Sequence, residues 1–214
     1  LMEIPKVGKG RVKMITEAWE KQKEIKDIIA YLCVVSNRRD DMRLKRIINE
    51  PKRKIGNTTI EAIEQIAHDA GCSMFEVMRN AAEYPAIARN AAKLGSFCDL
   101  IDGLSQVEKE EGLPALFEET IKRSGYQDML LNMGITELDR LENIRELISN
   151  AVEYSTTHEA ATLAGFLEEA ALVSDIDRYD EEADAVVMMT VHSAKGLEFP
   201  AVFIIGMEEN LFPS

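Results

Sequence analysis

The sequence has few of the residues that build disulfide scaffolds or metal centres. Its three cysteines, Cys33, Cys72 and Cys98, are odd in number and far apart, and no Cys-x-x-Cys pair or cysteine–histidine cluster accompanies them. Neither a disulfide framework nor a zinc site is therefore indicated. No apolar run reaches the roughly 18 residues of a membrane helix, and no signal peptide is evident. We expect a reducing cytoplasm and no membrane partner.

The chain also lacks a loop of the form Gly-x-x-x-x-Gly-Lys-[Ser/Thr]. Without that loop, nothing in the sequence cradles the β- and γ-phosphates of a nucleotide. No acidic strand end follows such a loop to hold Mg²⁺ and orient water. We therefore expect no ATP hydrolysis by this chain alone.

Global charge gives no sign of nucleic-acid binding. The 214 residues carry a formal net charge of −13 at pH 7, so contact with DNA would need a local basic patch. One stretch qualifies, because eight basic residues stand against three acidic ones between Arg38 and Lys54.

Most of the chain between residues 16 and 172 has helical periodicity. Apolar residues such as Leu141, Ile144 and Ile148 follow the i, i+3, i+7 spacing of one helix face. We interpret these stripes as the core of an amphipathic bundle, with no cofactor implied. Helices are predicted over residues 16–33, 41–49, 58–70, 74–82, 86–101, 113–123, 136–154 and 157–172.

Several helix ends have recognisable signals. Thr58 and Glu61 have the spacing of a capping box, Gly71 ends that helix, and Ser73 caps the next. In the helix over residues 41–49, we expect Met42 to face inward with its apolar neighbours.

The C-terminal segment differs in kind. Two short apolar runs, at residues 186–190 and 201–206, are rich in Val and Ile and too short for ordinary helices. Such runs are typical of buried parallel strands. The polar loop between them carries His192, Ser193, Lys195 and Glu198 at a strand end, where α/β sheets bind ligands.

This segment resembles motif V of superfamily 1 DNA helicases, and specifically the UvrD/PcrA/Rep branch. The matching residues are Thr190, His192, Lys195, Gly196, Leu197, Glu198, Phe199 and Pro200, followed by Gly206, Met207, Glu208 and Glu209 and by Leu211, Phe212 and Pro213. Residues 23–32, 124–126 and 140–147 are also similar to helices of the family's 2B domain. The resemblance implies that Thr190, His192 and Ser193 lie along single-stranded DNA, and that Lys195, Gly196 and Glu198 face the nucleotide.

A second candidate site is the start of the helix after Pro51. Free backbone N–H groups at a helix start attract anions, Gly56 permits close approach, and Lys52, Arg53 and Lys54 add positive charge. These features suit a duplex phosphate without base readout. The family carries a Gly-Ile-Gly turn here, similar to a helix–hairpin–helix contact to duplex DNA.

This chain has Lys54, Ile55 and Gly56 in place of that turn, so the first glycine is replaced and the tight turn is open to question. The expected duplex site comprises Lys52, Arg53, Lys54, Ile55, Gly56, Asn57 and Thr58. The alternative is a capped helix start with a solvated basic face.

The expected fold class is mainly α, a 2B-like helical bundle with a small part of a RecA-like α/β sheet. Residues 1–22 are unassigned, either a 2A strand or a junction. Residues 23–174 form the 2B-like domain, and residues 186–214 belong to 2A. Residues 175–185, between them, are read as an acidic linker, because their spacing does not match an EF-hand.

The functional hypothesis is a fragment of an ATP-dependent DNA helicase or translocase, acting in DNA repair or replication restart. The intact enzyme would use ATP and Mg²⁺. Expected partners are single-stranded DNA, duplex junctions, the remaining helicase domains and repair proteins. Two alternatives stay open: a regulatory protein-interaction domain, and part of a helicase–nuclease subunit.

Overall fold

The computed structural model describes residues 23–133, 138–158, 160–177 and 202–203. Over these ranges the chain is mainly α, as predicted, and contains no strand. The helices are α2 (Lys23–Ser36), α3 (Asp41–Ile47), α4 (Asn57–Ala70), α5 (Met74–Arg79), α6 (Ala91–Glu111), α7 (Leu113–Arg123), α8 (Tyr126–Met133), α9 (Leu138–Thr157) and α10 (Leu163–Asp177), with 3-10 turns η1 (Ala81–Glu83) and η2 (Ala88–Asn90).

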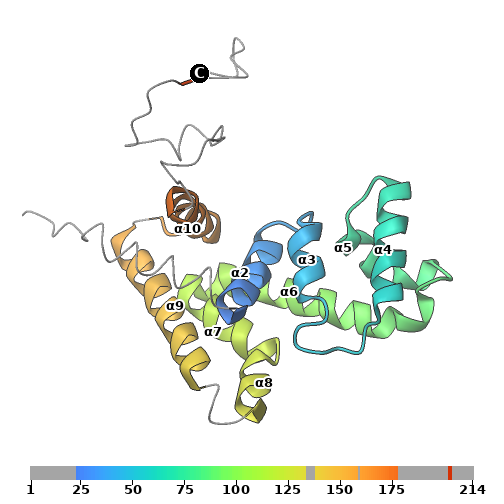
Figure 1. Cartoon of the computed structure of the whole chain (residues 1–214), viewed down its shortest axis with the longest axis horizontal. Coiled ribbons are helices and arrows are strands. Elements are labelled where there is room, and N and C mark those ends of the chain that lie inside the picture. The colour runs from blue at the N-terminus through green and yellow to red at the C-terminus, as the bar shows by residue number, and fades with distance from the viewer. Residues whose placement is uncertain (1–22, 134–137, 159, 178–201, 204–214) are drawn as a thin grey trace, which may run out of the picture.

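Helix α6 organises the described part of the chain. It has 21 residues and packs against α5 toward one end and α7 toward the other, with α2 between them. Figure 1 shows α3, α4 and α5 gathered at one end and α7 to α10 at the other. The turn between α3 and α4 belongs to the first group, and its Arg53 also reaches the carbonyl of Ser124, which directly follows α7.

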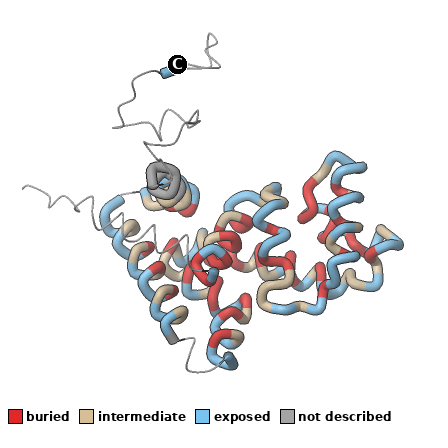
Figure 2. Tube along the Cα trace, viewed as in Figure 1, coloured by how far each residue is buried: buried red, intermediate tan, exposed pale blue. Residues whose placement is uncertain are grey.

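The core is built by the apolar faces of these helices, and Figure 2 marks their buried residues along the chain. Its largest fully buried side chains include Tyr31, Phe97, Phe117 and Tyr126. Burying an aromatic ring of this size stabilises a fold by roughly 1.5–3 kcal/mol. In the stripe predicted as core on α9, Ile144 and Leu147 are buried, whereas Leu141 and Ile148 are partly buried and pack against the core.

Several helices differ from their predicted bounds; α10, for example, lies over Leu163–Asp177 instead of residues 157–172. The helix predicted over residues 86–101 begins at Ala91 and continues to Glu111, because its buried stripe extends through Leu104 and Val107. Helix α8 was not predicted at all. Its eight residues bury Tyr126 and Leu130, and the positive φ of Gly125 breaks the chain just before it.

Around α3 and α4, two expectations are wrong. Met42 is 79% exposed rather than inward, while Leu44 and Ile47 fill the core side of α3. The capping box at Thr58 does not form, because α4 begins one residue earlier with Gly56 as its N-cap and no side-chain cap bond. The capping by Ser73 is confirmed: its hydroxyl accepts from the Glu76 N–H at 3.2 Å.

Two carboxylates of α2 are buried and fully engaged. Asp27 accepts from Arg46 Nε and from the Tyr126 hydroxyl, both at 2.7 Å. Glu24 accepts from Arg140 Nε at 3.0 Å and from Asn143 Nδ2 at 2.8 Å. Because buried charges need such partners, the two carboxylates tie α2 to α3, α8 and α9.

The predicted strands over residues 186–190 and 201–206 lie outside the described residues, except for residues 202–203, which belong to no helix or strand. Helix α10 runs on to Asp177, three residues into the predicted acidic linker. No described helix combines the length and the apolar character needed to cross a membrane.

Candidate nucleic-acid interface

The basic residues of the turn between α3 and α4 differ in their exposure. Lys52 and Lys54 are exposed, whereas Arg53 is half-buried and Ile55 is buried. Beyond them Gly56, Asn57 and Thr58 are exposed. The predicted duplex site is thus divided into residues that face solvent and residues that hold the turn.

Arg53 holds the turn against three other segments. Its Nη1 donates to the carbonyls of Ile47 at 3.0 Å and Pro51 at 3.1 Å. Its Nη2 donates to the Tyr31 hydroxyl at 2.6 Å and to the Ser124 carbonyl at 3.1 Å. Five guanidinium N–H groups are available, and the fold uses most of them, so Arg53 is a structural residue here.

Tyr31 completes this contact. Its hydroxyl accepts from Arg53 and donates to the Glu50 carbonyl at 2.8 Å. Burial raises the pKa of Tyr31 to about 12, although the nearby Arg53 guanidinium pulls it down. The hydroxyl is therefore neutral at pH 7 and serves as donor and acceptor at once.

Lys54 occupies the position where the family carries its first glycine, and its backbone is left-handed, with φ of 58°. A conformation that glycine favours is thus adopted here by a lysine. The Asn49 side chain supports it by accepting from the Arg53 N–H at 2.8 Å, and Lys93 Nζ donates to the Lys54 carbonyl at 3.2 Å.

We expect Lys54→Gly to raise the free energy of unfolding by up to about 1 kcal/mol, because a left-handed conformation costs a residue with a Cβ about 1–2 kcal/mol, part of which the looser unfolded chain offsets. The same variant removes an exposed charge, so duplex affinity should fall. Urea unfolding and DNA binding measure the two effects. A loss of stability would contradict the strained-turn account.

Gly56 leaves the start of α4 open. Its φ of −75° is one that any residue adopts, and a methyl group there would meet nothing closer than the Thr58 hydroxyl at 3.8 Å. The fold therefore does not require glycine at this position. No acidic residue stands in the first turn of α4, so the positive end of the helix dipole is not neutralised locally.

Other cations of the basic stretch are engaged with carboxylates. The pairs are Arg38 with Asp102, Arg43 with Asp40, Lys45 with Glu64 and Arg46 with Asp27. Among the described residues of this stretch, Arg39, Lys52 and Lys54 are exposed and have no such partner. Two of these three exposed cations therefore lie at the turn, and Arg39 lies before α3.

The UvrD-like helicase C-terminal domain family matches residues 16–214 of the chain. The chain belongs to this family. It is 40% identical over 199 residues to the ATP-dependent DNA helicase PcrA of Bacillus subtilis. The aligned region covers 90% of this chain and 27% of that protein. It is also 40% identical over 195 residues to the PcrA helicases of Staphylococcus epidermidis and Staphylococcus aureus, with the same coverage. The chain thus spans about a quarter of the length of these relatives.

Six of the predicted site residues of this UvrD-like chain fall outside the described residues. They are Thr190, His192, Ser193, Lys195, Gly196 and Glu198. Their placement along DNA and nucleotide stays a prediction. Within the described ranges, no group of three or more His, Cys, Asp or Glu side chains is arranged to hold a metal ion.

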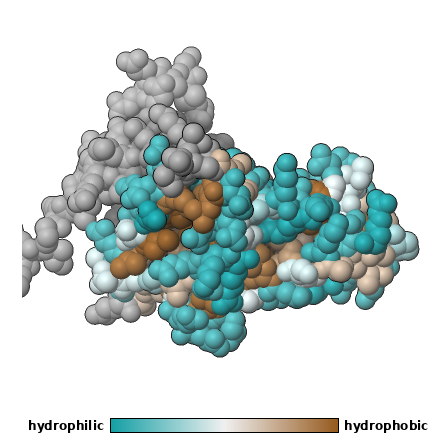
Figure 3. Space-filling view, turned by 90° about the horizontal axis from the view of Figure 1, so that it is seen from below, coloured by the Kyte–Doolittle hydropathy of each residue, from teal (hydrophilic) through white to brown (hydrophobic). Residues whose placement is uncertain are grey.

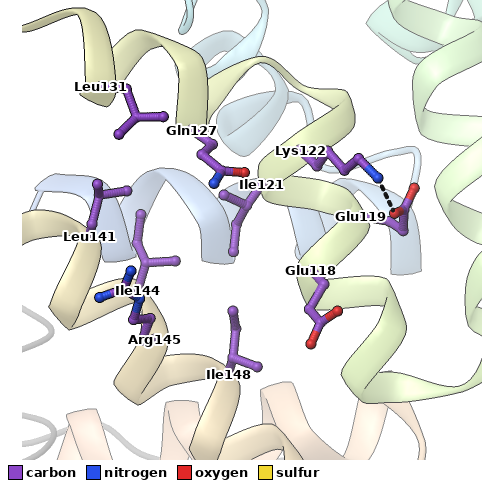
Figure 4. A pocket seen from close by; sticks show the side chains of 10 residues that line it. All are labelled: Glu118, Glu119, Ile121, Lys122, Gln127, Leu131, Leu141, Ile144, Arg145 and Ile148. Atoms are coloured by element: carbon purple, nitrogen blue, oxygen red, sulfur yellow. Dashed lines mark ion pairs between the residues drawn. The ribbon is translucent and has the colours of Figure 1, made fainter.

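The UvrD-like domain has a hollow of about 360 Å³ between α7, α8 and α9. Figure 3 shows apolar side chains at this end of the molecule, and Figure 4 shows Ile121, Leu141 and Ile144 around the opening. Its charged residues pair with neighbours: Lys122 Nζ lies 3.5 Å from Glu119, and Arg145 Nη1 lies 3.0 Å from Glu142. The hollow thus offers apolar surface and no unpaired cation.

Sequence reasoning missed two basic residues beside the turn. Arg89 in η2 and Lys93 in the first turn of α6 are exposed, in a segment without a charge run. Only the fold brings them to the turn, through the contact of Lys93 with Lys54 and a bond of 3.0 Å from Asn90 Nδ2 to Thr59 Oγ1. No pattern in the sequence connects positions more than 30 residues apart.

Proposed function

We propose that this chain is part of an ATP-dependent DNA helicase and that the turn from Lys52 to Thr58 contacts the backbone of duplex DNA. The observation that carries the proposal is the pair of exposed lysines without carboxylate partners beside the open start of α4. Backbone N–H groups and lysines bind phosphate oxygens and read no sequence. The contact is therefore expected to be independent of base sequence.

Within the turn, roles are divided. Lys52 and Lys54 supply charge, Gly56 leaves space for a phosphate, and Asn57 and Thr58 offer N–H groups at the α4 start. Arg53 and Ile55 take no part in the contact, because their side chains are committed to the fold. This narrows the duplex site predicted from the sequence to five residues.

For the whole protein we propose the family's activity, DNA translocation driven by ATP with Mg²⁺. In this proposal Lys195, Gly196 and Glu198 hold nucleotide, and Thr190, His192 and Ser193 line single-stranded DNA, all on the strength of the motif V resemblance. A phosphate-binding loop is absent from the chain, so we expect it to bind DNA without hydrolysing ATP. Repair-protein partners and a cytoplasmic location belong to the same proposal.

The test is duplex binding by the chain carrying Lys52→Glu and Lys54→Glu together. We expect affinity for a fluorescent blunt duplex to fall at least on the order of tenfold, with a shallower salt dependence between about 50 and 200 mM salt, because fewer counterions are released. The matched control is Lys26→Glu with Lys109→Glu, which reverses two exposed lysines elsewhere on the domain.

Equal affinity of the two double variants would contradict the duplex contact and favour the protein-interaction alternative, in which charge at the turn is irrelevant. The helicase–nuclease alternative makes the same prediction for this domain. The full gene distinguishes this alternative from the others, because a nuclease domain encoded further along would favour a helicase–nuclease subunit.

A further inference from the structure

The apolar hollow between α7, α8 and α9 has the form of a short groove. One wall is a row of apolar side chains on α9, at Leu141, Ile144 and Ile148, which are spaced i, i+3 and i+7. Figure 4 shows this row facing Ile121 of α7, with Leu131 of α8 at one end. At about 1.5 Å of rise per residue, the row runs roughly 10 Å along α9. That length matches about two turns of a helix laid in the groove.

Exposed apolar side chains gather on the helices that border this groove. Leu131 and Met133 on α8 are 55% and 56% exposed, and Val152, which continues the α9 row by four positions, is 44% exposed. The described helices have only one other large apolar side chain so exposed, Met42 on α3. Clustered exposed apolar side chains mark an interaction surface.

The α9 wall of the groove is held in place by α2. Arg140 Nε and Asn143 Nδ2 donate to the buried Glu24 carboxylate at 3.0 and 2.8 Å. These two residues directly precede Leu141 and Ile144, so the bonds that fix α9 on α2 also fix the apolar row. A rigid groove loses less conformational freedom when a partner binds than a flexible one does.

The charge around the groove is acidic. Helices α7, α8 and α9 together carry seven acidic side chains and four basic ones. Glu118 is the exception among the charged residues that line the hollow: it is exposed, and its carboxylate makes no ion pair or hydrogen bond within the described ranges. Its neighbour Glu119 is engaged by Lys122 and Arg123. A free carboxylate beside apolar side chains favours a partner that brings a cation next to its apolar contacts.

We propose that this groove is a docking site for an amphipathic helix of a partner protein, with an apolar stripe flanked by lysine or arginine. The apolar anchors of that helix enter the hollow between Ile121 and Ile144, and one of its cations pairs with Glu118. The inference is independent of the proposed duplex contact, because the hollow and the turn between α3 and α4 share no residue. DNA is not the ligand here, since an acidic surface repels phosphates.

The experiment measures binding of a fluorescein-labelled peptide of about 16 residues to the full chain by fluorescence anisotropy. The peptide has leucines at i, i+3, i+4 and i+7 with lysines beside them. We expect it to bind, and we expect a scrambled peptide of the same composition to bind more weakly by on the order of tenfold. Leu131→Asp should weaken binding by a similar factor, because it places a charge in the apolar groove. Its matched control, Met42→Asp, changes an exposed apolar residue on another helix and should bind as the wild type does.

A charge exchange tests the role of Glu118. Glu118→Lys should weaken binding of the lysine peptide by roughly threefold and strengthen binding of a peptide with glutamates in place of those lysines. Glu83→Lys is the control, since Glu83 is an exposed carboxylate in η1, outside the groove. No difference between these two variants would contradict the basic character of the partner.

Equal binding of the ordered and scrambled peptides, or equal affinity of Leu131→Asp and Met42→Asp, would overturn the docking site. A wild-type chain that dimerises in analytical ultracentrifugation, with Leu131→Asp monomeric, would also overturn it, because a second copy would then cover the groove. The chain carrying Lys52→Glu and Lys54→Glu should bind the peptide as the wild type does. Failure of the duplex contact is thereby distinguished from failure of the groove.

Discussion

Replacing Arg53 with methionine is expected to lower the free energy of unfolding by about 3 kcal/mol, the largest effect of any change in the basic stretch. The variant keeps much of the side chain's apolar volume and removes four hydrogen bonds. It leaves the Ser124 carbonyl and the Tyr31 hydroxyl without the Arg53 donor, while the Ile47 carbonyl keeps its bond from the Glu50 N–H at 3.1 Å. The guanidinium also lies over the Phe97 ring, 5.1 Å from its centroid, and that attraction is lost too.

Urea unfolding followed by circular dichroism measures this effect, with Lys52→Met as the control. Lys52 is the adjacent residue, exposed and without a carboxylate partner, so its substitution should change stability by no more than about 0.5 kcal/mol. If Arg53→Met were as stable as Lys52→Met and instead abolished DNA binding, Arg53 would be a phosphate ligand and its structural role would be refuted.

Replacing Asp27 with alanine should lower the free energy of unfolding by about 3–5 kcal/mol, the range for removing one partner of a buried ion pair. The Asp27 carboxylate is 1% exposed and receives Arg46 and the Tyr126 hydroxyl. Without it, the Tyr126 hydroxyl remains buried with no acceptor, and the Arg46 charge loses its counter-charge. Both losses weaken the packing of α2, the helix that contacts α3, α6, α7, α9 and α10.

Glu142→Ala is the matched control for Asp27→Ala, because it also removes a carboxylate from an arginine pair. Glu142 and Arg145 are 74% and 71% exposed, and exposed pairs contribute about 0–1 kcal/mol. The two variants are compared by urea unfolding. Similar losses from both would mean that burial does not decide the strength of these pairs.

The helices of this domain could be read from the sequence because local rules determine them. The spacing of Ile144 and Leu147 gave the core face of α9, and Ser73 gave the start of α5, since both signals lie within a few residues of their effect. The same rules failed where tertiary packing decides. Met42 is apolar, as core residues usually are, yet its position on α3 leaves it 79% exposed.

The candidate site was only half predictable, since sequence reports how many charges are present but not which partners they meet. Arg46 and Lys52 look alike in the basic stretch, but one is paired with a buried carboxylate 19 positions away and the other is exposed without one. From the sequence, Arg53 is predicted to bind phosphate. Its main partners in the fold are backbone carbonyls, and no sequence pattern indicates bonds to those. Arg89 was missed because only folding brings it beside α4.

The proposed function requires duplex DNA to contact the α4 start, and amide NMR spectra of the full chain titrated with a short blunt duplex test this contact most directly. The account predicts that the amide signals of Gly56, Asn57 and Thr58 shift together as duplex is added, and that the shifts are reversed by added salt. Shifts that gather around Leu131 and Ile144 at the apolar hollow, with the α4 start unchanged, would contradict it.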